Sequence, residues 1–361
     1  MISQFWGSKI VLITGHTGFK GSWLSLLLDS LGAKVHGYAL RPVESPNMFD
    51  QLGIAARISN EYGDVRDLKK LSATISRVRP DLIIHLAAQP LVRYGYSHPV
   101  ETYSTNVMGV VNLFEAVRSV DSVRVVLNVT TDKVYENCEW IWGYRESDRL
   151  GGVDPYSSSK ACAELVTAAY REAYLVKHNV QVATARAGNV IGGGDWSEDR
   201  LIPDLYRAIE SGKKIYIRNP DAVRPWQHVL DPLWGYLRLA AALYTADDDL
   251  CGGWNFGPLE YDTYKVEWIV ESFLAAWEQS PGWEIDDNES HPKESQALKL
   301  DSSKARAFLG WEPLWSLEKA LQVTVAWYQG YMAGQDLYEL TMAQIHAFQS
   351  ESNGESGGKK E

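Results

Sequence analysis

A short apolar run that leads straight into a glycine-rich turn limits the folds open to this chain. The run Lys9-Ile-Val-Leu-Ile-Thr14 is typical of a strand buried on both faces, as strands of parallel sheets are. The turn Thr14-Gly-His-Thr-Gly-Phe-Lys-Gly21 follows at once. Leucines then recur at helical spacing from Leu24 to Leu31, and Gly32 is placed to end that helix. Strand, glycine turn and helix in this order indicate the first unit of a nucleotide-binding α/β fold.

Strand and helix patterns continue to alternate along the N-terminal half. Further strands are predicted at residues 35–39, 82–87, 123–129 and 180–185, and helical stretches at 106–118 and 158–175. Because parallel strands need a crossover connection, this order predicts an α/β fold with a Rossmann-type doubly wound parallel sheet. Around Gly192 the pattern loosens into loops rich in glycine, tryptophan and proline, and a mixed region follows. We expect a smaller mixed α/β C-terminal substrate lobe that closes over the sheet edge.

The same patterns suggest how the chain is divided. Residues 1–190 and roughly 227–260 are expected to form the Rossmann domain. Residues 191–226 and roughly 261–340 are expected to form the second lobe. The polar, glycine-rich residues 350–361 are expected to be a disordered tail.

Composition excludes several classes of function. Thirty-five lysines and arginines against 46 aspartates and glutamates give a net charge of −11, which disfavours nucleic acid and anionic membranes as partners. The three cysteines have no CxxC spacing and the eight histidines no HxH or HExxH arrangement, so neither a disulfide framework nor a metal site is predicted. The first apolar run is shorter than the roughly 7 to 15 residues of a signal peptide. No run approaches the roughly 18 of a membrane span. The expected location is therefore the cytoplasm.

The glycine turn is suited to a pyrophosphate. Gly15, Gly18 and Gly21 let the backbone come close to the phosphates at a helix N-terminus, where free N–H groups and the helix dipole favour negative charge. An ordinary glycine-rich turn is the alternative, and the strand before it and the amphipathic helix after it favour the phosphate site. The second strand ends at Arg41 without the acid that usually binds the ribose of NAD. Asp64, after a probable third strand, is a candidate partner for the adenine edge.

A second group of polar residues carries the chemistry. Tyr156 and Lys160 lie four residues apart at a helix start, so they share a face, and a nearby cation lowers the pKa of a tyrosine. This spacing alone is weak evidence. Thr131-Asp132-Lys133 follow the apolar strand 123–129, and ligands of open α/β sheets bind at that carboxyl edge. The three features together predict an active site.

These motifs resemble the extended short-chain dehydrogenase/reductase superfamily over most of the chain. The glycine loop, His85-Leu-Ala-Ala-Gln89, Thr131 and the Tyr156/Lys160 pair fall in that superfamily's order. Within it, the chain looks most like the sugar-nucleotide 4,6-dehydratases, which carry Thr-Asp-Glu where this chain has Thr131-Asp132-Lys133. Longer runs resemble the branch that acts on CDP-glucose: residues 88–93, 99–106, 139–146, 186–196 and 224–228.

The resemblance implies NAD as cofactor, and Arg41 leaves NADP open as the less favoured alternative. It makes the Rossmann domain, residues 1–190 and roughly 227–260, the NAD-binding part and the second lobe the sugar-nucleotide-binding part. The implied cofactor contacts are Gly15, Thr17, Gly18, Phe19, Gly21, Asp64, Val65, Ala87, Ala88, Gln89, Asn106, Tyr156 and Lys160. Among these, Asn106 is expected to bind backbone near the active site.

The implied reaction converts CDP-glucose to CDP-4-dehydro-6-deoxyglucose and water by internal hydride transfer. Tyr156 takes the proton of the sugar 4-hydroxyl while hydride leaves C4, Lys160 holds the nicotinamide ribose, and Thr131 hydrogen-bonds the 4-oxygen. Asp132 protonates the departing 6-hydroxyl. In relatives with glutamate at position 133 that residue removes the C5 proton. Lys133 is a base only if its pKa is strongly depressed, and otherwise stabilises the enolate while another group acts.

Substrate contacts are implied for residues of the second lobe and the loops around it: Arg93, Asn189, Asp195, Trp196, Arg200, Arg224 and His228. Arg224 and Asn189 match residues for the nucleotide diphosphate. Asp195, Trp196 and Arg200 are expected around cytidine, with lobe core as an equal alternative for Trp196. Arg93 is expected either to face the substrate or to anchor a loop, whereas His228 and His85 are more often structural.

Relatives form homodimers through a bundle that includes the Tyr156–Lys160 helix, so a homodimer, or a tetramer, is implied. The family context suggests a bacterial pathway to deoxysugars of surface polysaccharides, such as lipopolysaccharide O-antigen. Other readings stay open. One is a different sugar-nucleotide enzyme of this superfamily, such as a GDP-mannose- or dTDP-glucose-type dehydratase, a decarboxylase or a 4-epimerase. Another is a catalytically dead binding regulator, which the intact Tyr156/Lys160 pair disfavours.

Overall fold

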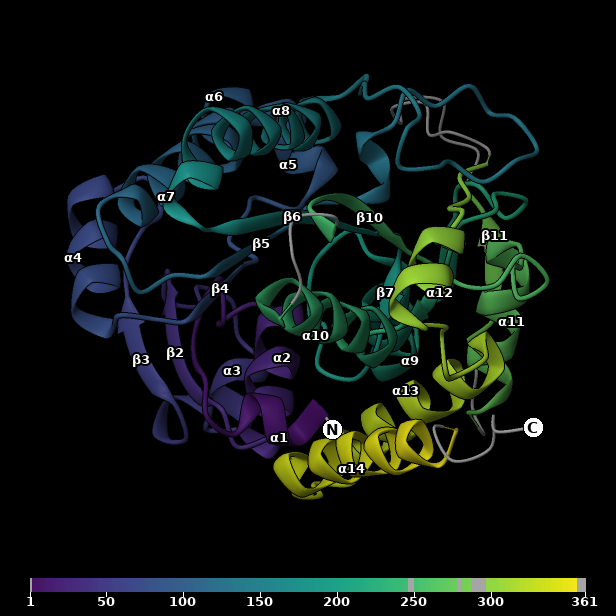
Figure 1. Ribbon diagram of the computed structural model, residues 1–361. Helices are drawn as coiled ribbons and strands as arrows, with labels where there is room; N and C mark the ends of the chain where they lie inside the picture. Colours follow the sequence, from purple (N-terminus) through teal and green to yellow (C-terminus); the bar gives the residue numbers. More distant parts are fainter. Residues whose placement is uncertain (1, 246–249, 278–280, 287–296, 356–361) are drawn as a thin grey trace, which may run out of the picture.

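A seven-stranded parallel sheet forms the centre of the protein in the computed structural model, which describes residues 2–245, 250–277, 281–286 and 297–355 (Figure 1). The strands run in the order β10-β6-β5-β4-β1-β2-β3. Their bounds are β1 Ile10–Thr14, β2 Lys34–Ala39, β3 Ser59–Tyr62, β4 Leu82–His85, β5 Val125–Val129, β6 Gln181–Ala187 and β10 Gly252–Phe256. Every neighbouring pair is parallel. The predicted Rossmann-type doubly wound sheet is confirmed, with strand ends that differ by a few residues.

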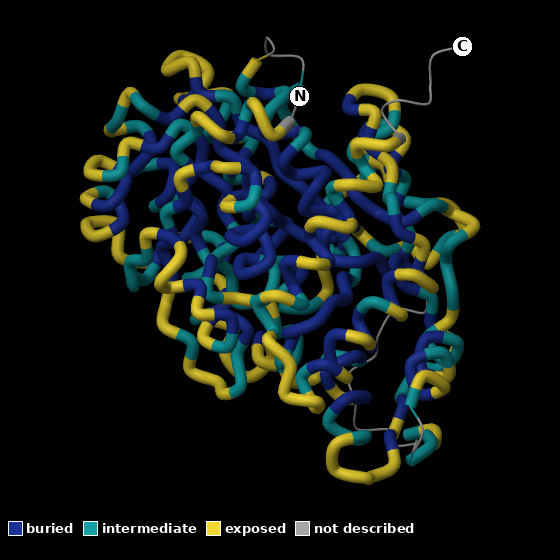
Figure 2. The backbone as a smooth tube through the Cα atoms, turned by 90° about the horizontal axis from the view of Figure 1, so that it is seen from below, coloured by how far each residue is buried: buried dark blue, intermediate teal, exposed yellow. Residues whose placement is uncertain are grey.

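Helices cover both faces of this sheet. Their bounds are α1 Ile2–Trp6, α2 Phe19–Ser30, α4 Leu68–Val78, α7 Gly109–Arg118, α8 Pro155–Tyr170 and α10 Leu230–Thr245. Val11 and Ile13 pack with leucines of α2 and α10, whereas Leu12 packs with α4 and α7. Alternate residues of one strand thus enter two different cores, which is why the strands are apolar throughout. Figure 2 shows this buried centre surrounded by exposed loops and helix faces.

The topology places a binding edge beside β1. The sheet order reverses there, because β1 pairs with β2 on one side and with β4 on the other. Open α/β sheets bind ligands outside the carboxyl ends of strands at such a point. The glycine turn after Thr14, the loop after His85 and the polar residues after Val129 therefore meet at one edge.

A smaller group of elements packs against that edge. Its helices are α9 Leu201–Ser211, α11 Val266–Ala275 and α13 Leu317–Met332, with two short parallel pairs, β7 Val190–Ile191 with β9 Gln227–His228 and β8 Ile215–Ile217 with β11 Trp283–Ile285. They share a separate core that contains Leu205, Phe273 and Leu321. The shorter elements include α3 Met48–Gln51, α5 Val92–Ser97, α6 Pro99–Tyr103, the π-helical segment Ser104–Met108 and α12 Ser303–Leu309. The exact division of the chain into domains stays a prediction.

The C-terminal segment differs from the sequence prediction. Helix α14 spans Leu337–Glu355, so a disordered tail is wrong for residues 350–355, while residues 356–361 lie outside the described part. Phe348 is buried against Trp234 and Trp315, and the Trp315 indole N–H donates to the Glu351 carboxylate at 2.8 Å. These contacts extend the helix into a polar sequence that has little periodicity of its own. None of the described helices combines the length and apolar character needed to cross a bilayer.

We expect Phe348→Ala to lower the free energy of unfolding by about 3–5 kcal/mol, because a fully buried ring would leave a cavity between α14 and the Rossmann core. Urea unfolding followed by tryptophan fluorescence measures the loss. Phe308→Ala is the matched control, since Phe308 is 70% exposed. Equal losses for the two variants would show that α14 does not stabilise the core.

Candidate active site

The glycine loop is packed against backbone on both sides. Gly15 has a left-handed backbone (φ +79°), and a Cβ there would lie 2.6 Å from the Ala87 backbone nitrogen. A Cβ on Gly21 would lie 2.1 Å from the Gly15 carbonyl oxygen. The loop therefore has room for hydrogen only at both positions, and it leads into α2 at Phe19 with Gly18 as the N-cap residue. A loop of this shape can hold a pyrophosphate at a helix N-terminus.

On the side of the loop where the adenosine is expected, the side chains contact one another. His16 hydrogen-bonds Asn60 at 2.6 Å and fills the space above Gly37, where a Cβ would lie 2.3 Å from its ring. Arg41 lies over the Tyr62 ring at 4.1 Å. The Asp64 carboxylate accepts from the Arg66 guanidinium at 2.6 Å, and this hydrogen bond, aided by charge attraction, lowers the Asp64 pKa against the opposing effect of its burial. Val65, the next residue, is buried beside Gly109. The contact of Asp64 with the adenine edge and that of Val65 with the cofactor stay predictions.

Asn106 pins the loop that follows β4. Its side chain accepts from the Gln89 backbone N–H at 2.8 Å and donates to the Gln89 carbonyl at 3.1 Å. It also donates to the Ser159 hydroxyl on α8 at 2.9 Å. The implied backbone contact of Asn106 is confirmed. Since Ala87 and Ala88 lie in the same loop, this amide links the loop beside Gly15 to α8.

The start of α8 is fixed by its cap. The Asp154 carboxylate accepts from the Ser157 backbone N–H at 2.9 Å, and Pro155 occupies the first helical position. Tyr156 and Lys160 lie one turn apart, as the spacing predicts. The Lys160 ammonium donates to the Val129 carbonyl at 2.8 Å, at the end of β5. Burial lowers the Lys160 pKa to about 8.

Tyr156 meets different neighbours from those expected. Burial raises its pKa to about 12, while a hydrogen bond with Thr131 and the charge of Arg200 work in the opposite direction. Burial therefore outweighs the predicted lowering of the tyrosine pKa, and Arg200 is a cation that favours the phenolate. The Lys160 ammonium is hydrogen-bonded to the backbone at the end of β5.

Thr131 and Asp132 lie directly after β5 and are buried. The Thr131 hydroxyl donates to one Asp132 carboxylate oxygen at 3.0 Å, and the other, Oδ2, is buried without a hydrogen-bond partner. Burial raises the Asp132 pKa, opposed by Lys133, Thr131, Arg224 and Lys20. A carboxyl that holds its proton more strongly than usual is suited to act as a general acid.

Lys20 is a site residue that sequence reasoning missed. Burial lowers its pKa to about 8, with Arg200 and Lys160 adding to the shift and Asp132 and Asp195 opposing it. Its ammonium therefore lies among the groups of the site. The available signal was a charged residue inside a glycine loop, next to the third glycine.

The arginines expected at the substrate differ in their partners. Arg224 is buried and close enough to Asp132 to lower its pKa, and it donates to the Val223 carbonyl at 2.9 Å. Arg200 pairs with the buried Asp195 at 3.2 Å. Arg93 pairs with Asp199 at 2.7 Å, which favours its loop-anchoring alternative. Thus the structure brings Arg200 close to Tyr156 and Arg224 close to Asp132.

Three other predicted residues have packing contacts. Trp196 lies in an aromatic cluster with Tyr206, Tyr328 and Tyr331, the lobe-core alternative, and its indole N–H donates to Gln51 at 2.8 Å. His228 is fully buried between Trp23 and Trp315, and the backbone of Asn189 accepts from Gln227 at 3.0 Å. Substrate contacts of these side chains stay predictions.

His85 is structural, as expected, because its ring bonds the Thr14 hydroxyl at 2.6 Å within the core. Burial lowers its pKa to about 3. Among the described residues, no group of three or more histidines, cysteines or acids is arranged to hold a metal ion.

Comparisons with known proteins agree with this geometry. The family model described as GDP-mannose 4,6 dehydratase matches residues 12–324. A CDP-glucose 4,6-dehydratase of Salmonella typhimurium is 48% identical over 96% of this chain and 98% of its own length. A dTDP-glucose 4,6-dehydratase of Xanthomonas campestris is 26% identical over 88% of this chain and 92% of its own.

Solved structures share the fold at lower identity. A dTDP-glucose 4,6-dehydratase of Bacillus anthracis, solved with NAD, is 23% identical, with a TM-score of 0.72 over 89% of this chain and 97% of its own. A UDP-glucose 4-epimerase of Thermotoga maritima, solved with UDP-glucose, is 21% identical, with a TM-score of 0.75 over 89% of this chain and 99% of its own. The matched residues include the glycine loop, the end of β5 and the start of α8, and the chain belongs to the GDP-mannose 4,6 dehydratase family.

Proposed function

We propose that this protein converts CDP-glucose to CDP-4-dehydro-6-deoxyglucose and water, with NAD as its cofactor. One observation carries the proposal: a phenol, a hydroxyl and a carboxyl, those of Tyr156, Thr131 and Asp132, meet at the end of β5 beside the glycine loop. The 48% identity to the Salmonella CDP-glucose 4,6-dehydratase supports the choice of nucleotide.

The loop fits the cofactor. Gly15 and Gly21 leave a backbone cradle that a single Cβ would fill, at the N-terminus of α2. The dTDP-glucose dehydratase solved with NAD supports NAD over NADP. When bound, NAD would supply an acceptor for the hydride of C4 and return that hydride at C6.

Tyr156 acts on the sugar 4-hydroxyl. Its phenolate oxygen takes the proton, and a high intrinsic pKa makes that oxygen a strong base once it is formed. The charge of Arg200 and the hydrogen bond with Thr131 favour the phenolate. Lys160 contributes a buried ammonium next to the ribose position, and the Thr131 hydroxyl stabilises the 4-oxygen.

Asp132 acts on the 6-hydroxyl. A 4-ketone acidifies the C5 proton, so water can leave across C5 and C6 if the departing oxygen is protonated. The Asp132 carboxyl, whose pKa burial raises, donates that proton. Lys133 stands beside it either as the base for C5 or as a cation that stabilises the enolate. Arg224 and Asn189 hold the diphosphate. Asp195 orients Arg200 toward the site through their ion pair.

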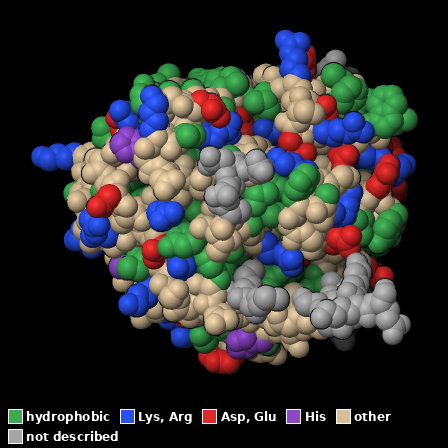
Figure 3. Space-filling model, viewed as in Figure 1, with side chains coloured by type: hydrophobic (Ala, Val, Ile, Leu, Met, Phe, Trp, Pro, Cys, Tyr) green, Lys and Arg blue, Asp and Glu red, His purple; other side chains and the backbone are tan. Residues whose placement is uncertain are grey.

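The working form is proposed to be a homodimer in the cytoplasm. Large apolar side chains are exposed on neighbouring helices: Val100 and Tyr103 on α6, Met108 on the π-helical segment and Leu165 on α8. Figure 3 shows hydrophobic side chains gathered over α6 and α8 at the top of the view. A second copy that covers this face would remove apolar surface from water. The product would then enter a deoxysugar pathway.

Incubation of the purified protein with CDP-glucose and NAD tests the function. We expect mass spectrometry to show loss of one water from the sugar nucleotide with no net reduction of NAD. Tyr156→Phe should remove nearly all turnover, by at least about 10²-fold, because the base is lost.

Parallel incubations with UDP-, GDP- and dTDP-glucose decide the nucleotide. Dehydration of one of these instead of CDP-glucose would show that the protein is a 4,6-dehydratase of the same family with a different nucleotide in its substrate. A product of unchanged mass but altered stereochemistry would indicate an epimerase, and no reaction with any of them would refute the proposed function.

Asp132→Asn should separate oxidation from elimination. We expect C4 oxidation to proceed while water loss falls by about 10²–10⁴-fold, because the amide cannot protonate the leaving oxygen. Persistent absorbance of reduced nicotinamide, with no dehydrated product, is the readout. Asp231→Asn is the matched control: Asp231 is also fully buried with one unpartnered carboxylate oxygen, but its other oxygen holds the Leu314 backbone, away from the site. Normal water loss in Asp132→Asn would exclude Asp132 as the acid.

A further inference from the structure

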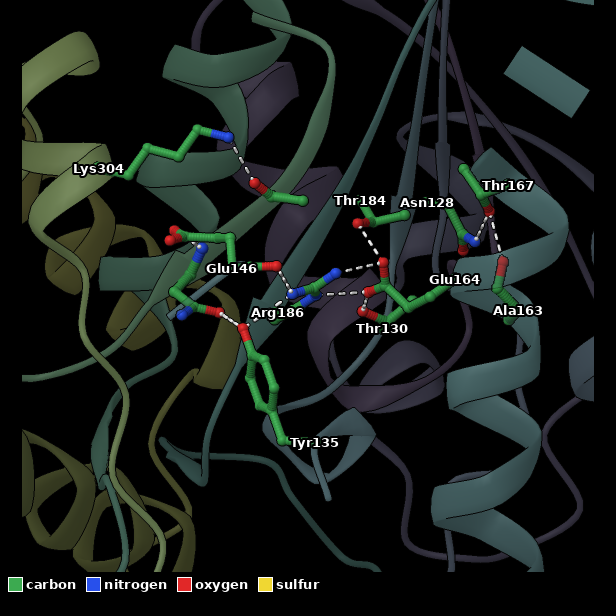
Figure 4. A network of polar contacts seen from close by, with 12 residues as sticks. Asn128, Thr130, Tyr135, Glu146, Ala163, Glu164, Thr167, Thr184, Arg186 and Lys304 are labelled. Atoms are coloured by element: carbon green, nitrogen blue, oxygen red, sulfur yellow. Dashed lines mark hydrogen bonds and ion pairs between the residues drawn. The ribbon is translucent and has the colours of Figure 1, made fainter. Parts of the chain in front are cut away.

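A buried ion pair lies behind the catalytic end of β5 (Figure 4). Arg186 on β6 donates from Nε to one Glu164 carboxylate oxygen at 2.9 Å and from a terminal nitrogen to the other at 2.8 Å. Both side chains are about 95% buried. None of the catalytic roles proposed above uses this pair.

Glu164 also accepts from two threonines, one directly after β5 and one on β6. The Thr130 hydroxyl donates to it at 2.5 Å and the Thr184 hydroxyl at 2.6 Å. The carboxylate thus receives four hydrogen bonds, which together with the Arg186 charge hold its pKa low against the opposing effect of burial. Thr130 is the residue directly before Thr131, so one of these bonds reaches the catalytic segment.

The other side of Arg186 is equally enclosed. Its remaining terminal nitrogen donates to the Tyr135 hydroxyl at 2.8 Å and to the Glu146 carbonyl at 3.2 Å. Tyr135 in turn donates to Asn255 on β10 at 2.7 Å. A Cβ on Gly253 would lie 2.6 Å from the guanidinium. These contacts enclose the Arg186 guanidinium, and the guanidinium in turn fixes the position of the Glu164 carboxylate.

Helix α8 holds three consecutive residues at the end of β5, the last two of the strand and the one directly after it. The Asn128 amide donates to the Thr167 hydroxyl at 2.8 Å, the Val129 carbonyl accepts from Lys160 at 2.8 Å, and Thr130 donates to Glu164. Tyr156 lies on the same helix, one turn before Lys160 and two turns before Glu164. The distance between Tyr156 and the segment after Thr130 is therefore set by these bonds.

We propose that Glu164 is a positioning residue, which through Thr130 fixes Thr131 and Asp132 against Tyr156. The inference rests on the proposed function, because it assigns Glu164 to the same reaction. Its carboxylate also favours the ammonium form of Lys160, against the effect of burial.

Thr130→Val and Thr184→Val form a matched pair of variants. Each removes one hydroxyl that donates to the same carboxylate at nearly the same distance, and each keeps the side-chain shape. Only Thr130 adjoins the catalytic segment. Glu164→Gln is the less useful variant, because it leaves the Arg186 charge buried without its counter-charge.

We expect Thr130→Val to lower kcat by about tenfold or more with KM within about twofold, since displaced catalytic groups slow the chemical step. Thr184→Val should keep kcat within about twofold, and the melting temperatures of the two variants should fall by similar amounts. Thr130→Ser, which retains the hydroxyl, should restore most of kcat. Equal kcat values for Thr130→Val and Thr184→Val would overturn the inference.

A measurement without substrate separates this inference from the proposed function. Hydrogen exchange at the backbone N–H groups of Lys133 and Val134, in the short turn bonded to Thr131, should accelerate about tenfold in Thr130→Val and stay unchanged in Thr184→Val. If the wild-type protein does not act on CDP-glucose, the proposed function fails and this comparison still decides the positioning role. Equal exchange in both variants would refute it.

Discussion

The attachment of α8 to the end of β5 is the interaction on which the active site depends. Tyr156 belongs to the helix, whereas Thr131 and Asp132 belong to the strand end, and neither element alone forms a site. The bonds from Lys160 to Val129 and from Thr130 to Glu164 bring the two together at one register. Asp154 fixes where the helix begins, and Asn106 ties the same helix to the loop beside Gly15. The glycine loop and the residues proposed to be catalytic thus share one rigid support.

Burial has opposite effects on the acids and bases of this site. Removal from water disfavours charge, so it raises the pKa values of Asp132 and Tyr156 and lowers those of Lys160 and Lys20, the two lysines to about 8. The usual difference in pKa between carboxyl and ammonium groups is therefore smaller in this site. Tyr156 and Asp132, the groups proposed to exchange protons with the sugar, both shift upward, so each holds its proton more strongly than it would in water.

Features that depend on neighbours in sequence could be predicted, and those that depend on distant partners could not. The strands, the glycine loop and the start of α8 follow from local apolar runs, glycines and the Asp154 cap. The direction of Lys160 toward Val129 and the role of Arg200 beside Tyr156 arise only when separate elements meet. The prediction of a disordered tail is wrong for residues 350–355 for the same reason, because contacts with Trp234 and Trp315 stabilise α14 more than its own helix propensity does.

The buried pair of Glu164 and Arg186 is better explained by geometry than by stability. Ion pairs removed from water are often no more stabilising than apolar side chains of similar volume, because desolvation offsets their attraction. An apolar pair at these positions would fill the space. It would leave the hydroxyls of Thr130 and Thr184 without a partner in a dry interior, each at a cost of about 1–3 kcal/mol. The Tyr135 oxygen would lose the Arg186 donor and keep only its bond to Asn255. A carboxylate with four donors, set against a guanidinium with fixed directions, instead holds β5, β6 and α8 at defined angles. That directional constraint is what a site built from two separate elements requires.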